Sequence, residues 1–396
     1  MFLSRALDVI GIALVLGTAP LLAELLVLTT ASLLPHARKK AKQVGSTEDF
    51  AITILVPAHN EEALIGRCIR SFASSVGPGV DLLAIAHNCT DRTASEAEAA
   101  GARVLMLNDP EQKGKGSALS FGFAEALAGP SKAVMVIDAD SVVSPGLIDA
   151  VREKFLCGAQ AVQCRYEVYN SEQSDRTRLM TLAFQAFNVI RPRGRDRLGL
   201  SAGILGNGFA LRREVLTRIP YCAYSVVEDL EYHLALVRAG IRVEFVDTAA
   251  VSGEMPQSDQ GACTQRARWE GGRRRMTRQW VPRLMGDLLG GRVRLLEPLL
   301  DLLTLPIATE VCLLFLAACL PVPWLRLYAS VGFLVLTLHV TAAAACGSGW
   351  RGTIRVLAEA PAYIFWKLRI IPEVWRASRA DSSWVRTARD TPGDSQ

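Results

Sequence analysis

The chain has 396 residues, 50% of them hydrophobic, and a mean hydropathy of +0.22. This length accommodates a folded domain of about 200 to 250 residues, and the excess of apolar residues indicates further segments in a membrane. The net charge is only +5 and the basic residues cluster beside apolar segments, which argues against the basic stripe of a nucleic-acid-binding protein. The nine cysteines have no metal-type spacing and fit unpaired thiols in a reducing compartment.

The N-terminal segment predicts a retained transmembrane helix over residues 1–42, including a basic flank. Residues 9–34 are almost wholly apolar, and the basic stretch of residues 36–42 follows them. A secretory signal would carry its positive charge before a shorter apolar core. The positive-inside rule then places the following domain in the cytoplasm. Glu24 is costly in hydrocarbon, so we expect it to face a helix partner.

Residues 48–285 contain no membrane-spanning run and alternate short apolar strands with helices. The predicted strands cover residues 52–56, 82–86, 104–107 and 134–137, and the predicted helices cover residues 61–73, 93–100, 116–127 and 145–156. Strands that alternate with helices in this way favour an α/β fold with a doubly wound, mostly parallel, Rossmann-like sheet.

The fourth predicted strand ends abruptly at two acids, Asp138 and Asp140. Side chains at positions i and i+2 of an extended segment point the same way, so both carboxylates can reach one hard divalent cation. The carboxyl ends of strands are also where open α/β sheets bind ligands. The pair therefore predicts a metal site for a phosphate-bearing substrate; the plain structural alternative is an acidic turn after a core strand.

Polar residues also follow the other predicted strands. Residues 57–62 (Pro-Ala-His-Asn-Glu-Glu) follow the first strand, residues 87–91 (His-Asn-Cys-Thr-Asp) follow the second, and the Lys-Gly-Lys-Gly turn of residues 113–116 follows the third. The glycines of that turn permit close backbone approach, and its lysines can neutralise phosphate. Each motif alone is typical of a solvated turn or a helix cap, but together they place polar groups at one edge of the sheet.

Two further acids, Glu228 and Asp229, open a predicted helix that ends near Ala239. Acids at a helix start are favoured by the helix dipole, which is the structural interpretation. The chemical interpretation is that one of the two is a general base at the mouth of the sheet.

Gln265, Arg268 and Trp269 stand at positions i, i+3 and i+4 and so share one helical face. An amide, a guanidinium and an indole on one face suit contact with phosphate and stacking on a sugar ring. The alternative is an interfacial helix whose basic residues lie beside anionic lipid, and both interpretations can hold together.

Past residue 285 the composition returns to that of a membrane protein. Residues 299–320 and 325–346 are predicted as two further spans, which makes residues 296–348 a membrane unit. Arg351 and Arg355 then return the chain to the cytoplasmic side. Residues 350–396 are expected to form an interfacial helix and a cytoplasmic tail.

The order of these motifs resembles the membrane-bound family 2 glycosyltransferases, the group that includes cellulose, chitin and hyaluronan synthases and many bacterial exopolysaccharide enzymes. The resemblance covers residues 50–285. It rests on an ordered set of motifs: Pro57 to Glu62, Thr90 and Asp91, Lys115 and Gly116, Asp138 to Asp140, Glu228 and Asp229, and Gln265 to Trp269.

What the resemblance implies is a glycosyltransferase-A fold that binds a nucleotide sugar and transfers the sugar with inversion to a glycan or lipid-linked acceptor, forming a β-linkage. Asp140, with support from Asp138, would hold Mg²⁺ or Mn²⁺ on the diphosphate, and Lys115 would contact the same group. Asp229 would deprotonate the acceptor hydroxyl. Cationic groups suit this reaction in any case, because charge develops on the leaving nucleoside diphosphate.

The resemblance also implies a set of substrate-binding residues. Gln265 and Arg268 would close over the diphosphate, and Trp269 would lie under the acceptor sugar. The remaining members of the set are Pro57, Ala58, Glu61, His87, Asp91, Asp138 and Glu228, together with Gly206, Asn207 and Gly208, which would line the acceptor pocket.

One residue departs from the family pattern. Family members usually carry an acid at the position of His87, and that acid typically reads the pyrimidine base. A neutral histidine can donate or accept one hydrogen bond but does not reproduce a carboxylate. A UDP-sugar is the leading expectation for the donor, and His87 is the one feature of the sequence that argues against it.

Three predicted spans are few for an enzyme that moves its own polymer across a plasma (inner) membrane. Either the protein transfers one or a few sugars to a lipid-linked acceptor, or it polymerises with partner export subunits or a second copy of itself. Two rival functions remain, a nucleotidyltransferase on a related sheet and a catalytically inactive scaffold subunit of a polysaccharide-export complex.

Overall fold

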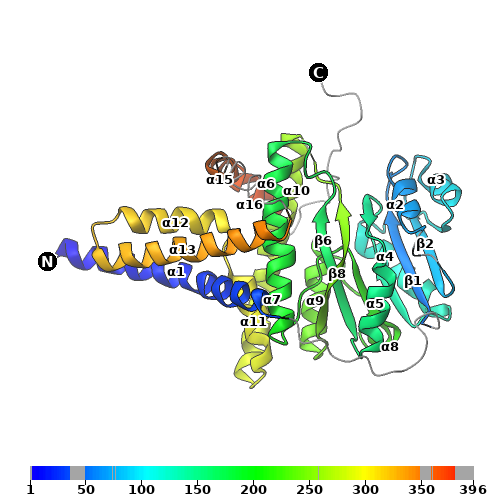
Figure 1. The fold of residues 1–396 in the computed structure, drawn as a ribbon, viewed down its shortest axis with the longest axis horizontal. Helices are drawn as coiled ribbons and strands as arrows, with labels where there is room; N and C mark the ends of the chain where they lie inside the picture. Colours follow the sequence, from blue (N-terminus) through cyan, green and yellow to red (C-terminus); the bar gives the residue numbers. More distant parts are fainter. Residues whose placement is uncertain are drawn as a thin grey trace.

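The computed structural model describes residues 2–35, 50–73, 75, 77–256, 258–347, 358 and 360–379. Three predicted features lie outside the described residues: the basic flank of residues 36–42, the returning arginines at 351 and 355, and the tail after residue 379. Figure 1 shows an α/β domain at one end, an arm of long apolar helices at the other, and a layer of upright helices between them.

The α/β domain is built on one sheet of eight strands in the order β3-β2-β1-β4-β7-β6-β8-β5. The strands are β1 (Ile52–Ala58), β2 (Val80–His87), β3 (Arg103–Leu107), β4 (Ala133–Val136), β5 (Ser141–Val143), β6 (Ala161–Val168), β7 (Phe209–Arg212) and β8 (Val243–Gly253). The ladders β1–β2, β2–β3, β1–β4 and β6–β8 are parallel, whereas β7 runs antiparallel to β4 and β6, and β5 antiparallel to β8. The predicted mostly parallel α/β sheet is therefore confirmed.

Helices cover both faces of this sheet, as its continuous apolar strands require. They are α2 (Ile65–Ser71), α3 (Thr93–Ala99), α4 (Lys115–Ala128), α5 (Leu147–Leu156), α8 (Arg213–Arg218) and α9 (Glu228–Arg238). Alternate residues of β1 serve the two faces: Ile54 packs with Phe155 of α5 on one face, and Leu55 packs with Phe123 of α4 on the other. The sheet is thus buried on both sides, and polar groups at its carboxyl edge remain available for chemistry.

The layer between the domain and the arm is formed by α6 (Asp175–Gln185), a π-helical turn (Ala186–Ile190), α7 (Arg191–Arg197) and the long α10 (Asp259–Leu289) (Figure 1). The sequence analysis assigns no element to the segment that forms α6 and α7. A capping box at Ser174 and Thr177 begins α6, because each side chain bonds to the backbone of the other residue.

The arm consists of α1 (Phe2–Leu33), α12 (Ile307–Cys319) and α13 (Pro323–Ala345). Among the described residues, Arg5–Leu33 and Pro323–Ala345 are each long and apolar enough to cross a membrane. Glu24 of α1 does face a helix partner, because Arg191 and Arg195 of α7 donate to its Oε1 at 2.6 and 3.0 Å. That expectation is confirmed.

The segment predicted as a span over residues 299–320 is bent in the structure. The chain forms α11 (Leu296–Leu303), after a short 3₁₀ turn (Val293–Leu295), and α12, and the two bend by 77° at the break between them. Pro306 explains the break, because it lacks a backbone N–H and disfavours helical conformation in the residue before it. The pair counts as a third span only if both helices together cross the membrane. Two short helices, α15 (Ala360–Arg369) and α16 (Ile371–Ala377), follow.

Candidate active site

A cavity of about 1870 Å³ opens at the carboxyl edge of the sheet and extends to the helical arm. Most of the predicted site residues line it: Pro57, Ala58, Glu61, His87, Lys115, Asp138, Asp140, Gly206, Glu228, Asp229, Gln265, Arg268 and Trp269. The fold thus brings together side chains that are far apart in the sequence.

Three predicted binding residues do not line the cavity, and each has a structural role instead. Asp91 accepts hydrogen bonds from the Thr93 backbone N–H and hydroxyl at the start of α3. Asn207 is fully buried and holds the loop of the acid pair. Gly208 has a φ of +74°, and a Cβ there would lie 3.0 Å from Val251, so its backbone conformation and its packing both favour glycine.

Asp138 and Asp140 lie in a loop that buried polar side chains hold in place. The Asn207 Oδ1 accepts from the Asp138 backbone N–H at 3.1 Å, and its Nδ2 donates to the Ser141 hydroxyl at 2.8 Å. The Ser141 hydroxyl donates in turn to Asp140 Oδ1 at 3.4 Å. Burial raises the pKa of Asp138, and the Lys115 ammonium beside it opposes that rise.

The acid pair fits a divalent cation that shares its coordination with a substrate. Within the described residues no group of three or more histidine, cysteine or acidic side chains could hold a metal ion alone. Mg²⁺ commonly uses one or two carboxylates and takes its other ligands from substrate phosphates and water. Asp138 and Asp140 provide that number of carboxylates at the edge of the cavity.

Lys115 stands at the first position of α4 and reaches across the cavity. Its ammonium forms an ion pair with Asp138, donates to the Gly206 carbonyl at 2.6 Å and lies 3.8 Å from Glu228 Oε1. Burial alone would lower its pKa, but attraction to Asp138 and Glu228 outweighs burial and raises it. Lys115 is therefore a fixed cation between Asp138 of the acid pair and Glu228.

Gly116 lets the start of α4 pack directly against the loop before α9, because a Cβ there would lie 2.2 Å from the Ala223 carbonyl oxygen. Gly116→Ala is therefore expected to lower the free energy of unfolding by about 1–3 kcal/mol, the usual cost of overpacking a core. Thermal unfolding in detergent measures this. The matched control is Gly129→Ala, at the other end of the same helix, where the nearest atom would be 3.6 Å away. Equal unfolding temperatures for the two variants would contradict the close approach.

Glu228 and Asp229 both lie in the first turn of α9 and line the cavity. Burial raises the pKa of Glu228 to about 7 and also raises that of Asp229. Glu228 already faces the Lys115 ammonium, whereas Asp229 Oδ1 accepts from the Leu230 backbone N–H at 2.8 Å. Gly206, with a φ of +79°, passes so close that a Cβ there would lie 3.1 Å from Asp229 Oδ2. Asp229 is the better placed of the two to accept a proton.

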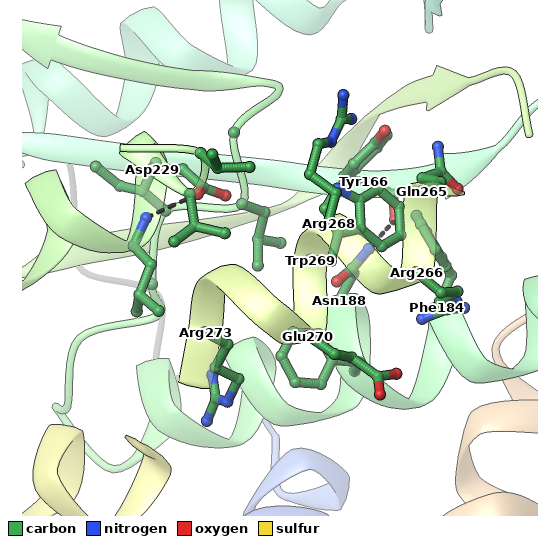
Figure 2. Close-up of a pocket in the computed structure, with 18 of the residues that line it drawn as sticks. Tyr166, Phe184, Asn188, Asp229, Gln265, Arg266, Arg268, Trp269, Glu270 and Arg273 are labelled. Carbon is green, nitrogen blue, oxygen red and sulfur yellow. Dashed lines mark hydrogen bonds between the residues drawn. The ribbon is translucent and has the colours of Figure 1, made fainter. Parts of the chain in front are cut away.

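Gln265, Arg268 and Trp269 lie on α10 and line the same cavity, as Figure 2 shows. Burial lowers the pKa of the Arg268 guanidinium, and attraction to Glu228 and Asp138 opposes this, so its charge is directed at the acidic centre. The Trp269 ring lies 6.0 Å from the Phe184 ring of α6, which holds the indole against the helix layer.

The sequence analysis misses Tyr166, Phe184 and Asn188, which also line the cavity. Tyr166 lies in the second half of β6, and its backbone carbonyl accepts from Asn188 Nδ2 at 3.4 Å (Figure 2). Asn188 lies in the π-helical turn, a deviation that is frequent at functional sites. No motif distinguishes these residues in the sequence, and only the capping box at Ser174 indicates that a helix begins nearby.

His87 lines the cavity but is itself buried, with 5% of its surface exposed. Its Nε2 is 2.8 Å from the Gln112 carbonyl oxygen, which can only accept, so Nε2 carries the hydrogen. Burial lowers the pKa of His87. The ring is therefore neutral near pH 7, and its Nδ1 can act only as a hydrogen-bond acceptor.

Comparison with known proteins finds relatives in sequence and in structure. "Probable glycosyltransferase YdaM" of Bacillus subtilis (strain 168) is 25% identical over 256 residues, which are 60% of this chain and 58% of that protein's length. A mannosyltransferase of Pyrobaculum calidifontis, solved with GDP-Man and Mn²⁺, has 17% identity and a TM-score of 0.54 over 94% of this chain and 97% of its own.

A glucosyl-3-phosphoglycerate synthase of Mycobacterium tuberculosis, solved with Mn²⁺, UDP and phosphoglyceric acid, is 26% identical, with a TM-score of 0.42 over 59% of this chain and 82% of its own. The sheet is of the glycosyltransferase-A type, as the similarity to the mannosyltransferase indicates. The model of the family described as "Glycosyltransferase like family 2" matches residues 50–272, more than half of the chain. The protein therefore belongs to glycosyltransferase family 2.

Proposed function

We propose that the protein is a membrane-bound, metal-dependent, inverting glycosyltransferase that moves a sugar from a nucleotide sugar to an acceptor hydroxyl. The observation that carries this proposal is the convergence of Asp138, Asp140, Lys115, Asp229 and the Gln265–Trp269 face on one cavity. A nucleotidyltransferase needs the acid pair but has no use for that helical face. A scaffold subunit would have no need to keep Asp140 or Asp229.

In this proposal Asp138 and Asp140 hold Mg²⁺ or Mn²⁺, the ions present in the glycosyltransferase structures to which the chain is similar. When bound, the cation stabilises negative charge on the diphosphate. Lys115 and Arg268 add positive charge beside the same diphosphate. Negative charge develops there as the nucleoside diphosphate leaves, and fixed cations stabilise that charge in the transition state. Gln265 closes over the diphosphate beside Arg268.

Asp229 acts on the acceptor. It takes the proton of one acceptor hydroxyl, whose oxygen then attacks the anomeric carbon in line as the bond to the diphosphate breaks. The product is a β-linked sugar, and the nucleoside diphosphate leaves. Trp269 supports the acceptor ring. Pro57, Ala58 and Glu61, which line the cavity together with His87, contact the donor in this proposal.

Although His87 replaces the acid usual in the family, its tautomer still allows it to bind uridine as the base of the donor. Its neutral ring offers one acceptor, Nδ1, which matches the single N–H of a uracil edge. A guanine edge presents two neighbouring donors, which a carboxylate would satisfy better than one ring nitrogen. The expected donor is therefore a UDP-sugar.

The helical arm anchors the enzyme in the membrane, with the catalytic domain on the cytoplasmic side of the plasma (inner) membrane. Its helices expose large apolar side chains such as Leu16 of α1 and Leu334 of α13, at 71% and 69% of their surface. Exposed apolar surface of this extent suits lipid contact. We propose in addition that the enzyme acts in polysaccharide or exopolysaccharide synthesis. Its partners would be a second copy of the same chain or export subunits.

The test measures which nucleoside diphosphate the purified, full-length protein releases from a panel of UDP- and GDP-sugars. With Mn²⁺ or Mg²⁺ present we expect UDP release, and with EDTA we expect release to stop and to return on adding Mn²⁺. Asp140→Asn is expected to abolish the metal response, whereas the exposed acid Asp149→Asn is the matched control. Metal-independent release would contradict the proposal, and pyrophosphate release from a nucleoside triphosphate would favour a nucleotidyltransferase.

A further inference from the structure

The cavity does not end at the catalytic acids but continues between the apolar helices. Leu21 and Leu25 of α1, Val311 of α12, and Phe333 and Leu336 of α13 line the same cavity as Asp138 and Asp229. A site for a soluble acceptor needs only the polar end. A cavity that joins a polar reaction centre to hydrocarbon-like walls suits a ligand that is itself polar at one end and apolar at the other.

The short helices α15 and α16 mark the level at which the two environments meet. They expose Phe365, Ile371 and Trp375 at 64%, 43% and 49% of their surface, close to basic residues of the same helices. Exposed aromatic and apolar side chains beside basic ones are typical of helices at a membrane surface. Tyr363 and Lys367 of α15 line the cavity as well, so the cavity passes the level of lipid headgroups.

One arginine of the cavity, Arg266, has two buried nitrogen atoms without a hydrogen-bond partner among the described residues. Arg191, Arg195 and Arg273 each contact a carboxylate at 2.5 to 3.0 Å. By contrast, the buried Nε and Nη2 of Arg266 donate to no atom of the residues that the structure describes. Its guanidinium lies over the Trp269 ring at 5.4 Å, and Figure 2 shows Arg266 and Arg268 extending in different directions from α10.

An unpaired, partly buried guanidinium is costly unless a ligand supplies an anion. We propose that the acceptor is an anionic lipid: its phosphate binds Arg266, its hydrocarbon chain lies between α1, α12 and α13, and its headgroup hydroxyl meets Asp229. This inference rests on the proposed glycosyl transfer. The hydroxyl oxygen forms the new bond to the anomeric carbon, Asp229 takes the proton, and the nucleoside diphosphate leaves with the electrons of the broken bond.

The experiment compares lipid transfer with donor breakdown in the same sample. The full-length protein is embedded in vesicles of phosphatidylcholine and phosphatidylglycerol, because the latter carries a phosphate and free hydroxyls. Label from the nucleotide sugar is counted in the organic extract, and released nucleoside diphosphate is measured in the aqueous phase. Their ratio reports how well the acceptor is used.

Two variants at the two ends of the lipid site should each lower this ratio roughly tenfold or more, one by losing a charge-assisted contact with the phosphate and the other by filling the space of the hydrocarbon chain. They are Arg266→Ala and Thr337→Trp, the latter placing a large side chain at an exposed position of α13 that lines the cavity. Their controls are Arg278→Ala on α10 and Leu334→Trp on α13, both exposed and away from the cavity lining. These should keep the ratio of the unaltered protein.

The outcomes separate the two proposals. If the unaltered protein releases nucleoside diphosphate from no donor, the proposed function fails. If it breaks down a donor but label stays in water-soluble material, or if Arg266→Ala and Thr337→Trp keep the original ratio, the lipid acceptor is wrong while the glycosyltransferase remains.

Discussion

Asp229→Asn is expected to reduce sugar transfer by about 10²- to 10⁴-fold, the usual contribution of a positioned general base. The amide keeps the shape of the carboxylate and can still accept from the Leu230 backbone N–H, so the start of α9 should stay intact. It cannot take a proton from the acceptor. Initial rates of transfer at saturating donor, together with nucleotide binding, measure the effect, and binding should change little.

The pH dependence of the transfer rate provides a second test of Asp229 as the base. The base must be deprotonated to act, so transfer falls as the pH drops through the pKa of Asp229. Burial raises that pKa, so the acidic limb of the profile lies above the range of an ordinary aspartate. In Asp229→Asn this limb should disappear from the residual rate.

Glu231→Gln is the matched control for this variant, because Glu231 lies in the same turn of α9 and accepts from the Ser225 backbone N–H at 3.1 Å, a bond that glutamine can keep. Its rate should stay near that of the unaltered protein. If Asp229→Asn transfers sugar at an undiminished rate, the base is another group, and Glu228 is then the next residue to test.

The sheet and the position of the acid pair can be predicted from the sequence because local patterns determine them. Apolar runs such as Ile52–Val56 can be satisfied only by burial on both faces, and parallel strands bring their carboxyl ends to one edge. This is why Asp138, His87 and Lys115 could be placed near one another from their spacing alone.

The rest depends on contacts that sequence patterns do not encode. The family resemblance places Asn207 and Gly208 in the acceptor pocket, yet Asn207 is buried under the acid pair and Gly208 packs against Val251. Phe184 and Asn188 reach the cavity because α6 and the π-helical turn after it lie between the sheet and the arm (Figure 1). Long-range packing of this kind leaves no periodic pattern in the sequence.

A cluster of buried charges joins the arm to the catalytic domain, and Asp301 of α11 is at its centre. Its carboxylate accepts from Arg191 at 2.7 Å, Arg195 at 2.5 Å and Arg273 at 3.0 Å. Glu24 of α1 and Glu297 of α11 complete the cluster, so that three arginines meet three acids. Because Arg273 lies one helical turn after Trp269 on α10, the cluster also fixes the helix that carries the Gln265–Trp269 face.

Asp301→Asn is therefore expected to destabilise the protein by about 3–5 kcal/mol, the usual cost of leaving buried charges without a partner. Unfolding in detergent measures this loss, and the surface pair of Glu172 with Arg178 provides the control, since the Glu172 side chain is 79% exposed and Glu172→Gln should cost at most about 1 kcal/mol. Removing one surplus cation together with the acid, in Asp301→Asn with Arg191→Met, should be less damaging than the sum of the single changes. Strict additivity, or a single variant as stable as the control, would mean that the arm and the catalytic domain are held together by apolar packing rather than by these charges.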